Sequence, residues 1–267
     1  PKERKVDMNK KAKIAAAALG IVAIGFGSLF STSNANASEK PEEIMKKSHL
    51  AYYYAADDGV ADVEMKIINK KGKERIRKFV MLRKDFEEGG EQRYFTYFKE
   101  PTDVSRMTFM VWKFQDKNDD RWIYIPSLDL VKPIAANDKH SSFVGSDFTY
   151  EDVSGRHWTE DAHMLEREEE LDGRSAFVIK NTPIDPKSAK YSYRISWIDK
   201  DTYLPLKEEY YDKKDKVVRI FEAGNIQEVD GFNTITERIM TDTKKNNKTI
   251  VTFTGIKYNQ GVKDNVF

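Results

Sequence analysis

Three acidic side chains lie close together near the middle of the chain, at Asp147, Glu151 and Asp152. Carboxylates grouped in this way could bind a cation, or could act as a paired acid and base. The alternative is structural, because an aspartate can cap a helix or turn while its neighbours stay in solvent. We favour the structural interpretation, with Asp147 as the capping residue.

The same region could supply a hydrolytic triad. Its candidate members are Ser146, His140 or His157, and Asp147 or Asp152. Ser146 is preceded by Gly145 and followed two residues later by Phe148, so it lacks the G-x-S-x-G motif of a nucleophile elbow. Nothing in the sequence places a base beside the hydroxyl group. A hydrolase therefore stays an alternative, and we predict no catalytic residues.

The chain contains four histidines and no cysteine. It has no H-E-x-x-H motif, and His157 and His163 are spaced for neither a helical nor a strand-bound zinc pair. The absence of cysteine excludes a thiol nucleophile, a cysteine-based zinc site and an iron–sulfur cluster. There is also no P-loop and no dinucleotide-binding fingerprint. We predict no metal and no cofactor.

Aromatic residues and prolines mark the stretch from residue 119 to 152. A short apolar strand, Arg121 to Ile125, stops at Pro126, because proline cannot donate to a strand ladder. The last part, Phe143 to Asp152, is too aromatic for an ordinary solvated loop, and Gly145 permits a turn that other residues resist. We therefore expect residues 135–152 to form a lid held against a core.

The elements around this stretch are mostly strands. Pro41 to Ala56 has helical spacing, with proline and glutamates favourable in the first turn. After Gly59 apolar residues alternate with polar ones, as in strands, and turn signals recur between the runs. The expected strands include 63–67, 75–83, 94–99, 106–114, 121–125, 128–134, 163–171, 175–181, 191–199, 204–211, 217–226, 232–241 and 249–258. This pattern predicts a single all-β domain over residues 38–267, with an antiparallel sheet and little helix.

One run breaks the alternation. Residues 107–112, MTFMVW, are apolar on both faces of the expected strand. In an antiparallel sheet this predicts that both faces are covered. The cover on one face could be the N-terminal helix, and on the other an opposite wall or a ligand.

The first 37 residues resemble an export signal. Met8 is the expected start, lysines follow it, residues 14–30 are apolar, and Ala35-Asn36-Ala37 gives the small-x-small cleavage pattern. The alternative is a single membrane anchor. Cleavage after Ala37 would remove six basic and two acidic residues, so the net charge falls from +1 to −3. That balance gives no basic face for nucleic acid.

Several motifs resemble one known family. They are Trp122-x-Tyr124-x-Pro126, the run FVGSDFTYED at residues 143–152, Pro101-x-Asp103, Trp197-Ile-Asp199, Pro205-Leu-Lys207 and Tyr210-Tyr-Asp-Lys213. Together they make most of the chain after residue 57 similar to the outer-membrane lipoprotein-sorting protein family. The resemblance implies the half-open antiparallel β-barrel of the periplasmic lipoprotein carrier, a LolA-like fold. The chain ends within the family's last strand-like motif, so we expect the natural protein to continue beyond Phe267.

The resemblance implies a periplasmic, monomeric, non-catalytic carrier of lipid or of lipid-modified protein. Most of its aromatic residues belong to a core, yet a sheet that curls without closing needs its concave face covered, and an acyl chain could cover it. We expect the acyl-binding residues to be Phe109, Trp112, Trp122, Tyr124, Phe143 and Phe148. An alternative is an accessory subunit that docks on an inner-membrane lipid exporter without binding cargo.

Overall fold

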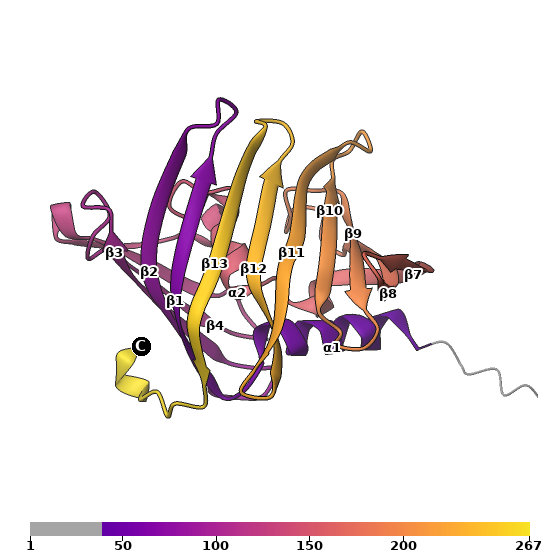
Figure 1. Ribbon diagram of the computed structural model, residues 1–267, viewed down its shortest axis with the longest axis horizontal. Helices are drawn as coiled ribbons and strands as arrows, with labels where there is room; N and C mark the ends of the chain where they lie inside the picture. The colour runs from indigo at the N-terminus through magenta and orange to yellow at the C-terminus, as the bar shows by residue number, and fades with distance from the viewer. Residues whose placement is uncertain (1–38) are drawn as a thin grey trace, which may run out of the picture. The chain divides into compact units, whose positions relative to one another are not determined.

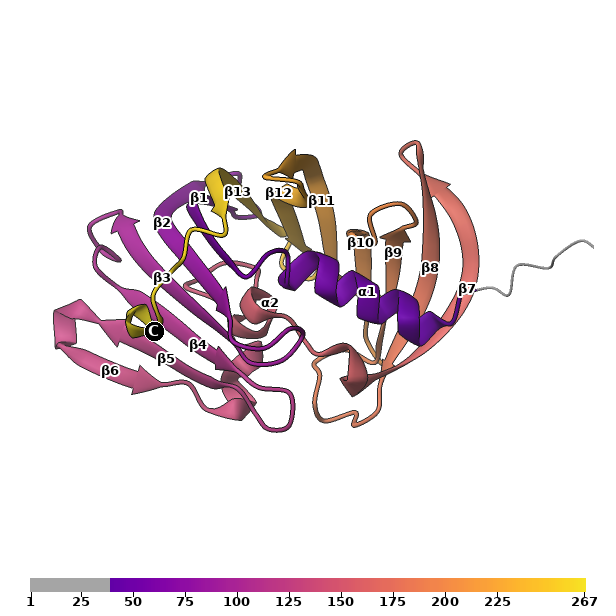
Figure 2. The same cartoon turned by 90° about the horizontal axis from the view of Figure 1, so that it is seen from below.

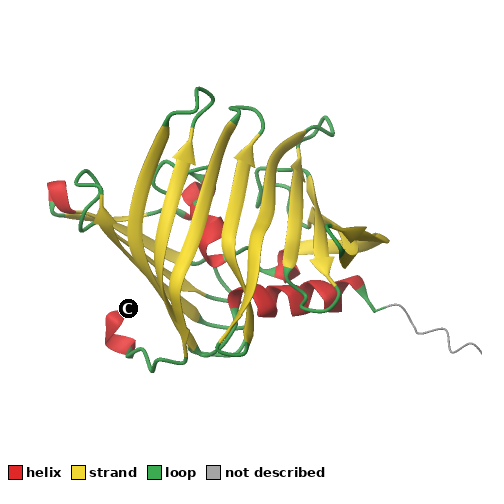
Figure 3. Ribbon diagram, viewed as in Figure 1, coloured by secondary structure: helices red, strands yellow, loops and turns green. Residues whose placement is uncertain are grey.

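The computed structural model describes residues 39–267. The predicted signal peptide and its cleavage site after Ala37 lie outside the described residues. Strands dominate the described part of the chain, and helix is confined to one long segment and a few short turns (Figure 3). Within residues 39–267, no helix has both the length and the apolar character needed to cross a membrane.

The chain runs from one helix into a long series of strands (Figure 1). The first half contains α1 (Pro41–Tyr53), β1 (Asp58–Ile68), β2 (Glu74–Asp85), β3 (Gln92–Glu100), β4 (Thr108–Lys113), β5 (Asp120–Ile125), η1 (Pro126–Leu128), β6 (Leu130–Pro133), η2 (Ala136–His140), α2 (Tyr150–Ser154) and η3 (Trp158–Glu160). The second half contains β7 (Asp161–Leu171), β8 (Arg174–Pro183), β9 (Tyr193–Asp199), β10 (Pro205–Tyr211), β11 (Val217–Val229), β12 (Phe232–Asp242), β13 (Asn247–Tyr258) and η4 (Asp264–Val266).

All the strands belong to one 13-stranded sheet, with the order β6-β5-β4-β3-β2-β1-β13-β12-β11-β10-β9-β8-β7. Every neighbouring pair is antiparallel. The sheet curves into a trough whose edge strands, β6 and β7, do not pair with each other, and α1 lies across its open side (Figure 2). The predicted half-open antiparallel barrel with an N-terminal helix is confirmed.

Tight turns fix the register of the hairpins. Asp172-Gly173 joins β7 to β8, and Asp230-Gly231 joins β11 to β12. All four residues have positive φ, between 50° and 85°. Two-residue hairpin turns of this kind match the twist of the strands, and glycine adopts the conformation without a steric penalty. The turn signals in the sequence therefore placed the strands correctly.

The helix α1 begins at Pro41, as predicted, and ends at Tyr53, three residues before the expected end. Proline suits the first helical position because the amide hydrogen that it lacks would have no partner there. Glu42 and Glu43 lie in the first turn, where their charge favours the positive end of the helix dipole. Ala56, with φ of 62°, redirects the chain into β1.

Residues 134–160 connect the two edge strands of the sheet, β6 and β7, and we call them the crossing segment. They include the predicted lid, residues 135–152. The segment passes over the concave face, where α2 lies inside the curve of the sheet (Figure 2). It packs there through Phe143 and Phe148, which belong to the main hydrophobic core. The short helix α2 was not predicted.

The run from Met107 to Trp112 was expected to be covered on both faces, and this is true of the inner face only. Phe109 and Val111 are fully buried inside the trough. On the outer face, Trp112 is half-buried, and its ring is covered by a side chain of the neighbouring strand, the guanidinium of Arg93 at 4.1 Å. The outer face of β4 therefore has partial cover from side chains and no second wall.

Candidate functional site

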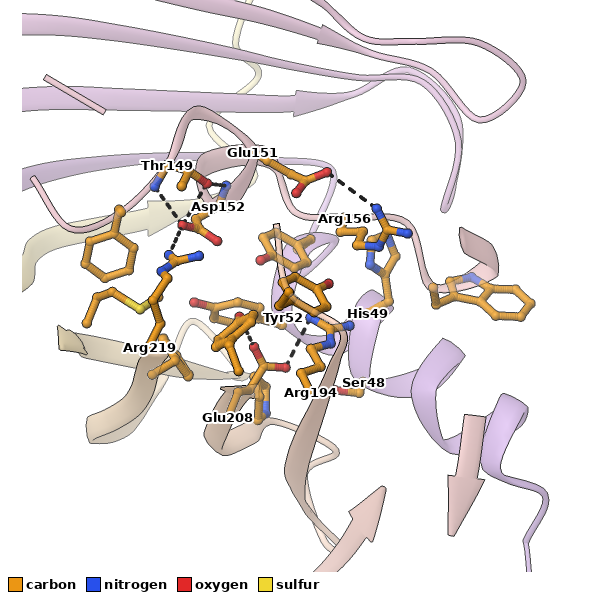
Figure 4. A pocket seen from close by; sticks show the side chains of 18 of the residues that line it. Ser48, His49, Tyr52, Thr149, Glu151, Asp152, Arg156, Arg194, Glu208 and Arg219 are labelled. Carbon is orange, nitrogen blue, oxygen red and sulfur yellow. Dashed lines mark hydrogen bonds and ion pairs between the residues drawn. The ribbon is translucent and has the colours of Figure 1, made fainter. Parts of the chain in front are cut away.

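A hollow of about 140 Å³ lies on the concave side of the sheet. Its walls come from α1, from the crossing segment and from β9 to β12, so parts of the chain that are distant in sequence meet there (Figure 4). We call it the polar hollow. It is lined by Met45, Ser48, His49, Tyr52, Tyr53, His140, Phe148, Thr149, Glu151, Asp152, Arg156, Trp158, Lys190, Tyr191, Arg194, Pro205, Glu208, Tyr210, Arg219, Phe221 and Met240.

One face of α1 serves two purposes. Ile44, Ser48 and Tyr52 follow one another at intervals of four residues, so they lie in a row on the same side of the helix. Ile44 is fully buried in a cluster with Phe177 and Ile179 of β8. The rest of the row turns polar and lines the hollow. The adjacent row also passes from an apolar residue to polar ones, and it consists of Met45, His49 and Tyr53.

Ion pairs cross the hollow from its strands. Arg194 lies 3.4 Å from Glu208 and 3.6 Å from Asp161. Arg219 donates a hydrogen bond to Asp152 and a second one, at 3.3 Å, to a backbone carbonyl of the crossing segment. The carboxylate of Asp152 raises the pKa of Arg219 against the opposing effect of burial. These pairs join strands of the sheet to one another and to the crossing segment.

A second group of charges lies within the crossing segment. The Glu151 carboxylate is 2.6 Å from the Lys139 ammonium and 3.3 Å from the His140 ring nitrogen Nδ1. Burial alone would raise the pKa of Glu151, but the hydrogen bond to His140 and the charge of Lys139 lower it to about 2. Arg156 bonds to Asp161 at 2.8 Å and reaches Glu151 at 3.9 Å. The buried charges are therefore largely compensated.

Several hydrogen-bond donors around the hollow have no acceptor. Among residues 39–267, no hydrogen bond is made to the hydroxyl groups of Tyr52, Tyr53 and Tyr191, whose pKa values burial raises, that of Tyr52 to about 12. In the same part of the chain, Nε of Arg194 and Nε of Arg219 are buried and lack a partner. Buried donors are normally satisfied, so the two arginine nitrogens mark a place where an acceptor is missing, and the half-buried tyrosine hydroxyl groups line the same hollow.

A smaller apolar pocket of about 40 Å³ lies next to the polar hollow. Its walls are mainly aromatic and aliphatic, and they come from β1, β2, β12, β13 and the crossing segment. It is lined by Met65, Phe79, Met81, Phe143, Phe148, Asp152, Val153, Arg238, Val251 and Phe253. Phe148 and Asp152 line both spaces. The crossing segment thus stands between a polar compartment and an apolar one.

Polar contacts around the start of α2 anchor the crossing segment. Thr149 caps α2 by accepting from the amide of Asp152, and the Asp152 carboxylate accepts from the Thr149 amide in return. Asp147, the predicted cap, instead accepts a hydrogen bond of 2.7 Å from the Thr249 hydroxyl of β13. The predicted capping role of Asp147 is therefore wrong, because Thr149 occupies the position before the helix. Glu151 and Asp152 were expected to stay in solvent, but Glu151 is buried and Asp152 is paired.

Lys113 reaches the inner face at the end of β4 and is almost fully buried. Its ammonium donates to the backbone oxygens of Ser154 and Gly155, at 2.7 and 3.2 Å, and so ends α2. Burial lowers the pKa of Lys113 to about 8. Burial, with the charge of Lys113, lowers the pKa of His157 to about 4, so this imidazole is neutral at physiological pH. No pattern in the sequence indicated that these charged groups would lie inside.

The six predicted acyl-binding residues do not form one site. Phe109 and Phe143 are packed in the aromatic core, and Phe148 lines both the polar hollow and the apolar pocket. Trp112, Trp122 and Tyr124 occupy the alternate positions of β4 and β5, on the outer face, where the two indole rings lie 5.5 Å apart. These three therefore contact neither interior space, and their predicted role in binding has no geometric support.

The hydroxyl of Ser146 is buried and donates to the backbone oxygen of Phe143 at 2.7 Å. No histidine among residues 39–267 hydrogen-bonds to it, and His140 is directed to Glu151. The three members of the proposed hydrolytic triad thus lie in separate interactions. In the same described range, no group of three or more histidine, aspartate or glutamate residues is placed to hold a metal ion.

A protein-family model, described only as an uncharacterized protein, matches residues 90–267. The chain belongs to this family. A DUF1329 family protein from Desulfovibrio piger is 28% identical, with a TM-score of 0.79 over 86% of this chain and 98% of that one. A domain from Vibrio parahaemolyticus, described as an outer membrane lipoprotein-sorting protein domain, is 27% identical, with a TM-score of 0.77 over 84% of this chain and 94% of that one.

A LolA superfamily protein from Nitrosomonas europaea shares the fold, with a TM-score of 0.66 and 18% identity over 86% of this chain and 98% of that one. No curated protein matches the chain. The predicted resemblance to the lipoprotein-sorting proteins is therefore confirmed at the level of family and fold.

Proposed function

We propose that this protein is a non-catalytic carrier that holds a lipid, or the acyl chains of a lipid-modified protein, inside its trough. The observation that carries the proposal is the position of the crossing segment. It fills the concave face of an open sheet and stands between a polar hollow and an apolar pocket. An amphiphile has the same two parts, and its tail gains about 0.8 kcal/mol for each buried methylene group.

The likeness to the Vibrio parahaemolyticus domain supports a sorting role, because that relative is described as a lipoprotein-sorting domain and covers most of the chain. The signal-peptide pattern before Ser38 supports a periplasmic location. The pairing of Glu151 with Lys139 and His140 supports a structural use of these groups, since none of them is left as a free acid or base.

The apolar pocket is too small to admit an acyl chain in the conformation described. The apolar pocket measures about 40 Å³, well below the roughly 300–1,000 Å³ of cavities that hold ligands. An acyl chain can enter only if Phe148 and its neighbours in the crossing segment move aside. The carrier therefore exists in an empty form, closed by its own aromatic side chains, and a loaded form.

The test is direct binding, with mass spectrometry of an organic extract from the natively purified protein and titration of delipidated protein with a fluorescent acyl probe. Phe148→Ala removes a ring that lines both spaces and should change probe affinity several-fold. Trp122→Ala is the matched control, because this ring lies on the outer face. A protein that carries no extractable lipid and binds no probe would refute the carrier function.

A second candidate is an accessory subunit that docks on an inner-membrane lipid exporter. The observation in its favour is the exposed apolar residues at the edge strand β6 and the turn before it, which are Leu128, Leu130 and Val131. Solvent-exposed apolar residues that cluster in this way often mark an interaction surface. Under this alternative, crosslinking in native membranes captures the exporter, and the purified protein contains no lipid.

A further inference from the structure

The polar hollow has more hydrogen-bond donors than acceptors to receive them. The hydroxyl groups of Tyr52, Tyr53 and Tyr191 have no partner among the described residues, nor do Nε of Arg194 and Nε of Arg219. A buried donor without an acceptor loses solvation that nothing in the fold replaces. Two such nitrogens, with three half-buried tyrosine hydroxyl groups around the same space, indicate that the space is built for an acceptor.

Arg194 is only loosely paired with the two carboxylates beside it. Arg194 lies 3.4 Å from Glu208 and 3.6 Å from Asp161. Both distances are longer than that of a charge-assisted hydrogen bond, about 2.7–2.9 Å. Asp161 Oδ2 has no hydrogen-bond partner in residues 39–267. The guanidinium of Arg194 is therefore held between two acids and bonded closely to neither, so it can turn toward a third anion.

We propose that the polar hollow binds an oxyanion, a phosphate or carboxylate group, at the head of the amphiphile that the trough carries. The inference rests on the proposed carrier function and adds the chemistry of the head group. A hollow of about 140 Å³ is several times the volume of a water molecule, about 30 Å³, so it has room for a group of several heavy atoms. The tail would leave past Phe148 toward the apolar pocket.

The same contacts link binding of the head group to movement of the crossing segment. Arg219 bonds to Asp152, and Asp152 completes the cap of α2 with Thr149. An incoming oxyanion competes with Asp152 for Arg219, because both present carboxylate-like oxygens to the same donor. Release of Asp152 removes one anchor of α2 next to Phe148, which is the ring that must move for a tail to enter.

A cationic head group is the opposite possibility, since Glu208 and Asp152 also line the hollow. Both carboxylates already accept hydrogen bonds, Glu208 from Ser196 and Tyr210 and Asp152 from Thr149 and Arg219. Among the buried unpartnered atoms beside the hollow, Nε of Arg194 and Nε of Arg219 are donors, and an ammonium group offers them no acceptor. The arrangement therefore favours an anion, and the cation becomes a test outcome.

The experiment compares sixteen-carbon probes that share a tail and differ in the head. Delipidated protein is titrated with palmitate, hexadecyl phosphate, hexadecanol and hexadecylamine, and separately with inorganic phosphate. We expect the two anionic probes to bind at least tenfold more tightly than the alcohol or the amine. Tyr191→Phe and Tyr52→Phe, which remove only unpartnered hydroxyl groups, should lower the affinity for the anionic probes several-fold and leave hexadecanol unchanged.

Arg93→Gln is the matched control, because this arginine stacks on Trp112 on the outer face and should change none of the affinities. Equal binding of all four probes overturns the oxyanion site and leaves the carrier function in place. Tightest binding of hexadecylamine also overturns it. Binding of inorganic phosphate alone supports an oxyanion site for a free anion and refutes the carrier function. No binding of any probe refutes both.

Discussion

The two ends of the trough interior are filled in opposite ways. Toward β2, β3 and β4, the rings of Phe79, Phe98, Phe109 and Phe143 meet with centroids 4.8–6.3 Å apart, and none is more than 3% exposed. Toward β9 to β12, ion pairs and tyrosines surround a hollow instead. The crossing segment contributes to both regions. The tightly packed aromatic core and the polar groups of the hollow therefore meet separate ends of one segment.

The largest expected loss of stability comes from a change at the aromatic end of the trough. Phe143→Ala removes a ring that contacts four others and should lower the free energy of unfolding by about 3–5 kcal/mol, measured by urea denaturation. Trp122→Ala, on the outer face, should lower it by much less. Comparable losses for both variants would show that the aromatic end is not the more tightly packed region.

The next effect comes from the charged part of the segment. Because the pKa of Glu151 is lowered to about 2, its ionised form stabilises the fold at pH values above about 4.3, the value for an unfolded glutamate. That stabilisation, on the order of 3 kcal/mol, is lost as the pH falls from about 4.3 through about 2. The stability difference between wild type and Glu151→Gln should therefore shrink across this window in acid-titrated melts. A constant difference would contradict the pairing with Lys139 and His140.

A smaller effect concerns the link between sheet and crossing segment. Asp152→Asn removes the charge that pairs with Arg219 and should lower the free energy of unfolding by about 1 kcal/mol, as partly exposed pairs do. Hydrogen exchange should rise in the amides of α2 and stay unchanged around Phe143. Faster exchange at Phe143 as well would mean that the two ends of the segment are not independent.

The smallest expected effect on stability is at the polar hollow. Tyr191→Phe deletes a hydroxyl group that no described residue bonds, so the free energy of unfolding should change by no more than about 0.5 kcal/mol. Thermal melts of the variant test this. A loss of several kcal/mol would show that the hydroxyl is part of the fold and is not a free donor.

The strands could be predicted because each carries its own signal. Alternation and turn residues such as Asp172-Gly173 act locally, and every expected strand of the described chain is present in the sheet. The helix α1 was equally clear from Pro41 and its first turn. By contrast, α2 has 5 residues, which is too few for helical periodicity to show. Its signal was the cap formed by Thr149 and Asp152.

The residues of the site could not be predicted for a different reason. Alternation along β4 already places Phe109 and Trp112 on opposite faces, so grouping them was avoidable. The hollow, however, is made by Arg194, Glu208 and Arg219, charged residues on strands that usually face solvent. Their burial depends on which distant segment covers them, and one sequence does not contain that information.

The pairing of β1 with β13 has a consequence for the order of folding. The strands β1 to β6 and β7 to β13 form two series of neighbouring hairpins, and only the seam between β1 and β13 joins strands from opposite ends of the chain. Contacts so distant in sequence form slowly. We expect each series to form first and the seam last, so a chain that has not yet completed β13 exposes the unpaired edge of β1, which is a template for aggregation. A chaperone that shields this edge until the last strand arrives would raise the yield of folded protein.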